Sequence, residues 1–337
     1  MKHWWETAQL YGRIARLAAS DRRAALATVV RIHGSAYRRP GAKLLIEDDG
    51  RMIGGVSGGC LEADVREVGL ATLRSETSRL LHYDTGADED AVWGLGLGCN
   101  GAVDVFVQPA NAAFLRAVVE PTLARLHADQ RFAIVTTVEG LDAGKASVRD
   151  VRADEAASHL DDTSAGRTFT EILEPPPRLV ICGGGADAVP LVRFAGDCGF
   201  RVTLVDHREA YLAPEGLPDG TRCVLRRPES GIDGLPGSAT TYVVVKMHAL
   251  THDEAWARAF LGTEVAYIGL LGPRDRTDRI ISRIGTPDAR VFGPVGLDLG
   301  ADGPEQIAAS IVAELLAVHA GRTPAHLRDR ARAIHAG

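Results

Sequence analysis

The sequence predicts a two-domain α/β protein whose second domain is built on a doubly wound parallel sheet. Three observations predict this class. The length of 337 residues exceeds that of one typical domain. Pro175-Pro176-Pro177 is a stiff spacer, which divides the chain into domains at residues 1–174 and 178–337. After the spacer, short apolar strands alternate with helices, as they do in parallel α/β sheets.

The first domain mixes helices and strands, according to the period of its apolar residues. Helices are predicted over about residues 4–20, after Cys60, and over 111–126. Strands are predicted over a further set of segments, namely 24–32, 43–47, 102–108, 132–139 and 168–173. Residues 140–166 are polar and contain few large apolar side chains, so no element is assigned to them.

In the second domain, strands and helices alternate. The predicted strands are 178–182, 201–205, 241–245 and 265–268. The predicted helices are 189–198, 253–261, 275–283 and 303–319. The continuous β-branched runs among these strands are typical of parallel strands that are buried on both faces.

The composition is that of an ordinary globular protein, with 45% hydrophobic and 24% charged residues. A net charge of −6 argues against a surface for nucleic acid or anionic membrane. We expect a cytoplasmic protein, because the sequence contains neither a signal core nor an apolar run of membrane length. The five cysteines are odd in number and lack CxxC spacing, which argues against a disulfide framework and a four-cysteine zinc site.

Two of these cysteines lie in glycine-rich stretches of the first domain. Cys60 follows Gly58-Gly59 and precedes a predicted helix, and Cys99 follows Gly98. Glycine lets backbone amides approach a ligand closely, and a helix N-terminus favours a thiolate. Each cysteine is therefore either a thiol placed for contact or a small buried residue at a tight turn.

A glycine-rich loop also opens the second domain. The segment 183–188 reads Gly-Gly-Gly-Ala-Asp-Ala between a strand and a helix, which is the G-x-G-x-x-A form of the dinucleotide fingerprint. Gly183 permits the tight turn, Gly185 permits close approach of a pyrophosphate, and Ala188 permits close helix packing. Asp206 ends the next strand, where an acid takes ribose hydroxyls. A Rossmann-like fold is predicted; binding of NAD(P) or another nucleotide and a fold without ligand both stay open.

Other loops of the second domain carry further candidates. Gly272 and Arg274 stand at a predicted helix start, where an anion site and ordinary turn chemistry are the two interpretations. Asp298 lies in the glycine-rich stretch 293–300, which allows the same two interpretations. His248 follows a predicted strand and is either a base or ligand, or a structural residue.

In the first domain, Arg38 and Arg39 stand beside a turn. Guanidinium groups bind phosphate and other oxyanions in a bidentate manner. The pair would therefore hold a phosphate or a pterin oxygen, or would lie at a solvated hairpin tip.

The chain resembles the XdhC/CoxI family of accessory proteins for molybdenum hydroxylases such as xanthine dehydrogenase. The resemblance covers nearly the whole chain and rests on five stretches, which are residues 34–41 (GSAYRRPG), 54–62 (GGVSGGCLE), 98–101 (GCNG), 267–274 (YIGLLGPR) and 294–300 (PVGLDLG). Two positions depart from the family pattern. Many members have proline in place of Tyr37 and histidine in place of Ala186.

This resemblance implies an N-terminal XdhC/CoxI domain and a C-terminal Rossmann-like domain. It implies a protein that binds molybdenum cofactor (molybdopterin), protects it, and inserts the sulfurated form into a molybdenum hydroxylase. We expect a cysteine desulfurase as a second partner and a homodimer as the assembly. Thiolates suit soft metal centres, so Cys60 and Cys99 are the expected contacts of molybdenum or of a transferable sulfur. An accessory role is favoured over catalytic turnover.

Two alternatives belong to other functional classes. One is an NAD(P)-dependent oxidoreductase that uses the second domain, with Cys60 or His248 as the catalytic group. The other is a nucleotide-sensing adaptor that only docks a partner enzyme.

Overall fold

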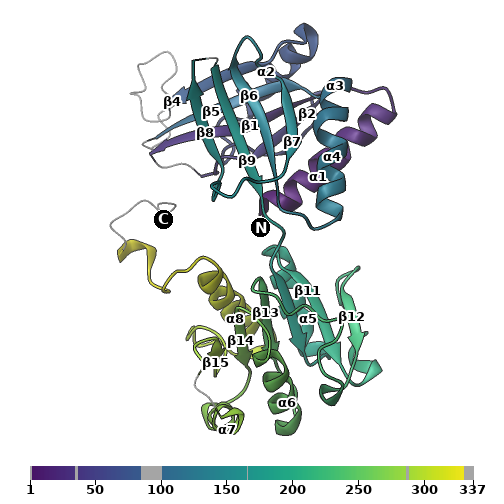
Figure 1. The fold of residues 1–337 in the computed structure, drawn as a ribbon, viewed down its shortest axis with the longest axis vertical. Coiled ribbons are helices and arrows are strands. Elements are labelled where there is room, and N and C mark those ends of the chain that lie inside the picture. Colours follow the sequence, from purple (N-terminus) through teal and green to yellow (C-terminus); the bar gives the residue numbers. More distant parts are fainter. Residues whose placement is uncertain (1, 35–36, 85–100, 165, 286–287, 330–337) are drawn as a thin grey trace. The chain divides into compact units, whose positions relative to one another are not determined.

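The computed structural model describes residues 2–34, 37–84, 101–164, 166–285 and 288–329. The chain separates into two compact units, residues 2–175 and 176–326 (Figure 1). Mixed helices and strands, with a parallel six-stranded sheet in the second unit, confirm the predicted α/β class. Across the described ranges, no helix combines the length and the apolar character that crossing a membrane requires.

The first unit contains the following elements in chain order: α1 (Lys2–Ala19), β1 (Ala24–Gly34), β2 (Lys43–Glu47), β3 (Met52–Gly54), α2 (Glu62–Ser75), β4 (Arg79–Asp84), β5 (Gly101–Pro109), α3 (Ala112–Phe114), a π-helical turn (Leu115–Val119), α4 (Glu120–His127), β6 (Phe132–Gly140), β7 (Ala146–Arg149), β8 (His159–Thr163) and β9 (Gly166–Leu173).

Two antiparallel sheets form the framework of this unit. The larger has the strand order β3-β2-β1-β5-β4 and the smaller the order β7-β6-β9-β8. Strands β3, β4, β7 and β8 were not predicted from the sequence. All four are edge strands, and β8 is half-exposed to fully exposed along its length, so it lacks the apolar alternation that identifies a strand.

Both faces of the five-stranded sheet are covered. On one face, α2 packs through Val65 and Leu73 against alternate residues of β1, β2 and β5 (Figure 1). On the other face, Leu26 and Leu45 join a core formed with α1, the 112–127 helical segment and the smaller sheet. This packing holds the first turn of α2 at one end of the sheet.

The second unit contains β10 (Arg178–Cys182), a 3-10 turn (Ala186–Ala188), α5 (Val189–Asp197), β11 (Arg201–Asp206), a 3-10 turn (Glu209–Tyr211), β12 (Arg222–Leu225), β13 (Thr241–Val245), α6 (Leu250–Leu261), β14 (Tyr267–Leu270), α7 (Arg274–Ile284), β15 (Val291–Phe292) and α8 (Gly303–His319).

Its sheet has the order β12-β11-β10-β13-β14-β15, and every pair of neighbours is parallel. Helices α5 and α8 pack on one face, and α6 and α7 pack on the other. The strand order reverses direction between β10 and β13, which makes the carboxyl ends of these two strands the usual ligand crevice of such a fold. The edge strands β12 and β15 are short and were not predicted.

Candidate functional site

Cys60 lies on an exposed glycine loop that connects β3 to α2. The side chain is a free, exposed thiol, and it stands two residues before Glu62, the first residue of α2. Gly59 has φ +118°, a conformation that disfavours any other residue. The loop therefore presents the thiol to solvent next to the start of a 14-residue helix.

The carboxylate of Glu62 holds this loop in place. It accepts the backbone N–H of Ser57 at 2.8 Å, that of Val56 at 3.2 Å and that of Gly59 at 3.1 Å. It also accepts the hydroxyl of Ser57, which in turn accepts the backbone N–H of Leu61 at 3.0 Å. Burial raises the pKa of Glu62, but the hydrogen bonds from Ser57 and from the backbone outweigh it and leave the pKa below its ordinary value.

An aromatic ring lies against the same loop. A Cβ built on Gly58 would stand 3.5 Å from Cγ of Tyr37, whose side chain is 78% exposed. Tyr37 belongs to the turn between β1 and β2, and Gly34 at the end of β1 pairs with Gly101 at the start of β5. Gly98 and Cys99 lie outside the described residues, so the prediction of a thiol pair stays a prediction.

The neighbouring basic residues are engaged within the first unit. Arg38 donates to both carboxylate oxygens of Glu6, at 2.7 and 2.6 Å. Arg39 is exposed and also makes an interaction of its own. Buried Lys43 is paired with Glu171. Burial, together with the charges of Lys43 and Arg38, lowers the pKa of His3 to about 3, which leaves its ring neutral at pH 7.

One polar cluster of the first unit was missed by the sequence analysis. Asp104 on β5 is buried and accepts from Arg31 on β1 at 2.8 Å, and its second oxygen lies 2.6 Å from Nδ1 of His82 on β4. The three residues stand opposite one another in the register of adjacent strands. This cluster could not be predicted from the sequence, because β4, the strand that carries His82, was not predicted.

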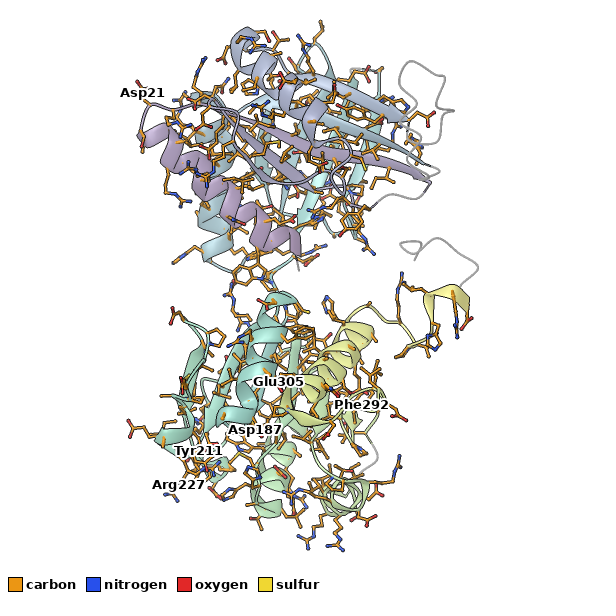
Figure 2. The ribbon with its side chains drawn as sticks, turned by 180° about the vertical axis from the view of Figure 1, so that it is seen from behind. Asp21, Asp187, Tyr211, Arg227, Phe292 and Glu305 are labelled. Carbon is orange, nitrogen blue, oxygen red and sulfur yellow. The ribbon has the colours of Figure 1, made fainter. Side chains whose placement is uncertain are left out.

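In the second unit, the glycine loop follows β10 as predicted. However, Tyr211, in the turn after β11, packs directly against this loop. Gly185 has φ +104°, and its N–H donates to the carbonyl of Tyr211 at 2.9 Å. A Cβ on Gly184 would lie 2.1 Å from the same carbonyl oxygen. Asp187 and Tyr211 accordingly lie near each other beside this loop (Figure 2). Ala188 is fully buried, which matches its predicted packing role.

Asp206 is also engaged. Its carboxylate accepts the backbone N–H of Gly184 at 2.8 Å and the guanidinium of Arg208 at 3.0 Å, and Arg208 lies 3.5 Å above the ring of Tyr211. Burial opposes ionisation, but these hydrogen bonds lower the pKa of Asp206 to about 2. A ribose would have to replace Arg208 to reach this carboxylate.

The crevice between β10 and β13 contains a small cavity of about 150 Å³. Buried Lys246 lines it and pairs with Asp187 at 2.9 Å, and Gly303 and Pro304 at the start of α8 complete it. This volume is below the range of about 300–1,000 Å³ that small-molecule sites have.

The remaining candidates of this unit lie in surface loops or, for Arg274, at the first residue of α7. His248, Arg274 and Asp298 are exposed. Gly272 has φ +145°, and a Cβ there would strike Arg276, which pairs with Asp253 at 2.5 Å. Within the described part of the chain, no group of three or more His, Cys, Asp or Glu side chains is placed to hold a metal ion.

Comparison with known proteins agrees with this architecture. Residues 17–84 match the family described as XdhC and CoxI, and residues 179–315 match the XdhC Rossmann domain. A Bacillus subtilis protein named as a probable subunit of xanthine dehydrogenase is 34% identical over 315 residues, which span 89% of this chain and 94% of that protein. The chain belongs to the XdhC and CoxI family. The family resemblance found in the sequence is thus confirmed.

Two further relatives of this XdhC and CoxI member are informative. A crystal structure described as a xanthine dehydrogenase from Bacillus halodurans superposes with a TM-score of 0.80 at 28% identity, over 93% of this chain and 96% of that one. The Escherichia coli protein named molybdenum cofactor insertion chaperone PaoD is 33% identical over 109 residues, which span 32% of this chain and 31% of that protein.

Proposed function

We propose that this protein is an accessory factor that binds molybdenum cofactor and delivers it, in sulfurated form, to a molybdenum hydroxylase. The observation that carries the proposal is the exposed Cys60 thiol, presented by a glycine loop whose amides are held by Glu62. A thiolate suits a soft metal with sulfur ligands. The relative named as a molybdenum cofactor insertion chaperone supports the same cargo.

The residues of the Cys60 loop are better suited to contact the molybdenum of the cofactor than to bind its phosphate group. Glu62 and Ser57 already accept the N–H groups of Val56, Ser57, Gly59 and Leu61, so these amides are not available to an anion. In the proposal, Cys60 contacts molybdenum or its transferable sulfur, Gly58 and Gly59 leave room for it, and the exposed ring of Tyr37 shields one side.

Cys99 is the second proposed thiol. Gly98 and Cys99 are followed by Gly101, which begins β5 beside the end of β1. Arg38 and Arg39, in the turn after β1, are the proposed phosphate contacts, and Arg38 would exchange Glu6 for the phosphate.

The partners follow from the same proposal. The hydroxylase is the recipient, and a cysteine desulfurase is the class of enzyme that supplies sulfur to a cofactor of this kind. We also propose that the protein acts as a homodimer. In the second domain, NAD(P) or another nucleotide stays a proposed ligand, with contacts at Gly183, Gly185, His248, Gly272, Arg274 and Asp298. Asp206 would join them on release of Arg208, and Ala188 would keep its packing role.

Among the described residues of the second unit, no contact favours the oxidoreductase alternative. Tyr211 lies against Gly184 and Gly185, and Arg208 pairs with Asp206, so both halves of the dinucleotide fingerprint make internal contacts. Consumption of NADH with a test substrate would support that alternative. The adaptor alternative predicts that function survives the loss of Cys60.

Transfer of the cofactor tests the proposal. The protein is loaded anaerobically with released molybdenum cofactor and mixed with a cofactor-free molybdenum hydroxylase from the same organism. We expect faster gain of hydroxylase activity than with free cofactor, and loss of this advantage in Cys60→Ser. Cys223→Ser is the matched control, because Cys223 is also an exposed free thiol but lies in the second unit. Equal activation by Cys60→Ser and the unaltered protein would contradict the role of Cys60.

A further inference from the structure

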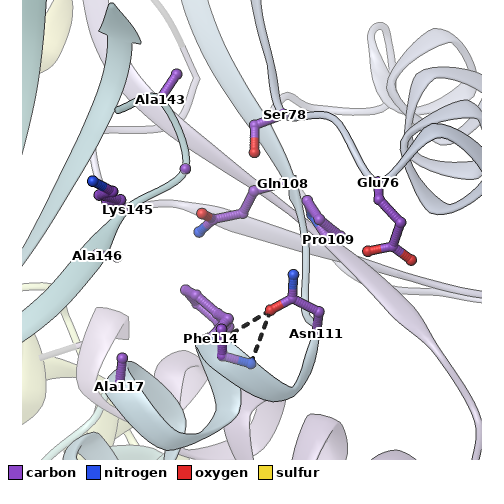
Figure 3. Close-up of a pocket in the computed structure, with 12 residues that line it drawn as sticks. Glu76, Ser78, Gln108, Pro109, Asn111, Phe114, Ala117, Ala143, Lys145 and Ala146 are labelled. Carbon is purple, nitrogen blue, oxygen red and sulfur yellow. Dashed lines mark hydrogen bonds between the residues drawn. The ribbon is translucent and has the colours of Figure 1, made fainter. Parts of the chain in front are cut away.

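A cavity of about 410 Å³ lies in the first unit, at the opposite end of β5 from the Cys60 loop (Figure 3). Its lining comes from the ends of α2 and β5, the start of the 112–127 helical segment and the turn before β7. The volume is within the range of about 300–1,000 Å³ that small-molecule sites have. Gly101 and Gln108 are seven residues apart on the strand, so this cavity is separated from the strand end near Cys60 by about 24 Å.

Gln108 is the polar group at the centre of this cavity. The residue as a whole is 4% exposed, but its side-chain amide is not among the described polar groups that are both buried and unpartnered, so the amide is open to the cavity. Figure 3 shows the amide extending from β5 between Ser78 on one side and Phe114 on the other. An amide that faces a cavity can pair with a ligand that offers one donor and one acceptor side by side.

The neutral groups around Gln108 add donors and flat apolar walls. Ser78 places its hydroxyl at the cavity, and a side chain on Gly144 would displace it, since the added Cβ would lie 2.7 Å from Oγ. Asn111 caps the helix by accepting the N–H groups of Ala113 and Phe114 through Oδ1, a role that does not use its amide nitrogen. Phe114 and Pro109 form the walls.

The charged groups at the rim are already paired. Lys145 forms an ion pair with Asp142 at 2.7 Å, and Glu76 lies 3.6 Å from Arg23. All four side chains are more than half exposed, so the rim pairs are solvated and of little energetic consequence. The polar group that the cavity leaves available to a ligand is therefore a neutral amide, which offers one acceptor and two donors.

We propose that this cavity binds a small, planar, uncharged lactam heterocycle, whose adjacent N–H and C=O groups pair with the side-chain amide of Gln108. The pairing is reciprocal: the Gln108 oxygen accepts the lactam N–H, and the Gln108 NH₂ donates to the lactam oxygen. The ring lies between the walls formed by Phe114 and Pro109. A one-turn π-helix, Leu115–Val119, follows Phe114 directly and contributes Ala117 to the lining, and such turns recur at functional sites.

Uracil and 1,3-dimethyluracil are matched probes for this proposal, because methylation removes both lactam N–H groups and keeps the ring. Binding to the full chain is measured by ligand-observed NMR. We expect millimolar binding of uracil and at least tenfold weaker binding of 1,3-dimethyluracil. No binding of uracil up to its solubility limit, or equal binding of both probes, would overturn the proposal, and neither result depends on a variant.

A pair of variants separates ligand binding from folding. Gln108→Leu removes the amide and should weaken uracil binding at least tenfold, while its Tm stays close to that of the unaltered protein, because the amide faces the cavity and holds no other element in place. Gln130→Leu makes the same change at an exposed glutamine outside the cavity and should leave binding unchanged. Unweakened binding by a folded Gln108→Leu variant, or a lowered Tm from loss of a structural contact, would contradict the proposed role.

Discussion

Ser57 donates both its backbone N–H, at 2.8 Å, and its hydroxyl to the carboxylate of Glu62. This pairing closes the loop that carries Cys60, because Val56 and Gly59 donate to the same carboxylate. A glycine-rich loop would otherwise sample many conformations, since glycine restricts the backbone least. The position of the thiol therefore depends on a carboxylate that follows it by two residues in the sequence.

Removal of that carboxylate should release the loop. For Glu62→Ala, we expect faster amide hydrogen exchange across residues 56–61 and a loss of about 1 kcal/mol in unfolding free energy, because partly buried loop amides lose their acceptor. Glu67→Ala, at an exposed position on the same helix, should change stability by less than about 0.5 kcal/mol. Unchanged exchange in the Glu62 variant would show that other contacts hold the loop.

The same contact should respond to acid. The pKa of Glu62 is lowered in the folded protein, so its contribution is complete above the ordinary pKa of a glutamate and is lost as the pH falls through the lowered value. Exchange protection of residues 56–61, corrected for intrinsic rates, should be the same at pH 7 and pH 5 and should fall below about pH 4. Protection that declines between pH 7 and pH 5 would point to another titrating group.

The cysteines should differ in reactivity. Cys60 is exposed, whereas Cys182 on β10 is fully buried, and burial raises the pKa of its thiol. At neutral pH, we expect iodoacetamide to alkylate Cys60 roughly tenfold or more faster than Cys182, because the reagent requires an accessible thiolate. Peptide mass spectrometry over time provides the rates. Comparable rates at the two sites would contradict the exposed placement of Cys60.

Two glycines of the second unit should respond to alanine in opposite directions. At Gly184, the new Cβ would lie 2.1 Å from the carbonyl oxygen of Tyr211, so the chain above the loop must move, at a cost of about 1–3 kcal/mol. At Gly196, inside α5, the Cβ would meet nothing within 4 Å, and alanine should stabilise by roughly 0.5–1 kcal/mol. Urea denaturation of the two variants measures both effects. A stabilised Gly184→Ala protein would show that Tyr211 does not cover the loop.

Asp206 should make stability depend on pH in the acidic range. Its folded pKa is about 2 against an ordinary value of 3.8, so its contribution of about 2 kcal/mol is present above pH 4 and is lost as the pH falls toward 2. The difference in unfolding free energy between the unaltered protein and Asp206→Asn should therefore be largest near pH 7 and shrink below pH 4. A difference that is constant from pH 7 to pH 2.5 would contradict the ion pair with Arg208.

Strands with strong apolar patterns could be predicted from the sequence, whereas those at the sheet edges could not. The segment 43–47 was predicted residue for residue as β2, since its side chains are all buried. Strand β8 and the short β15 escaped prediction because an edge strand is stabilised by backbone pairing with its neighbour, which leaves little trace in its own side chains. The helices were found to within a few residues, because their apolar faces repeat at helical spacing.

The candidate site was only partly visible in the sequence. The placement of Cys60 beside a helix start could be predicted because glycines precede an apolar helical pattern. The contact of Tyr211 with the dinucleotide-type loop could not be predicted from the sequence. It joins backbone atoms of Gly185 and Tyr211, which are 26 positions apart in the chain. The pairing of Arg208 with Asp206 could not be predicted either. An aspartate at the end of this strand is expected both where it binds a ribose and where it pairs with a neighbouring arginine.

Retention of molybdenum cofactor by the purified protein is the sharpest test of the proposal that this protein binds the cofactor through Cys60. Purified protein is mixed anaerobically with released molybdenum cofactor and desalted, and the retained molybdenum and pterin are measured for the unaltered protein, Cys60→Ser and Cys223→Ser. We expect the unaltered protein and Cys223→Ser to retain molybdenum and pterin stoichiometrically, and Cys60→Ser to retain much less of both. No retention by the unaltered protein would contradict the proposed function, and full retention by Cys60→Ser would contradict the proposed role of its thiol.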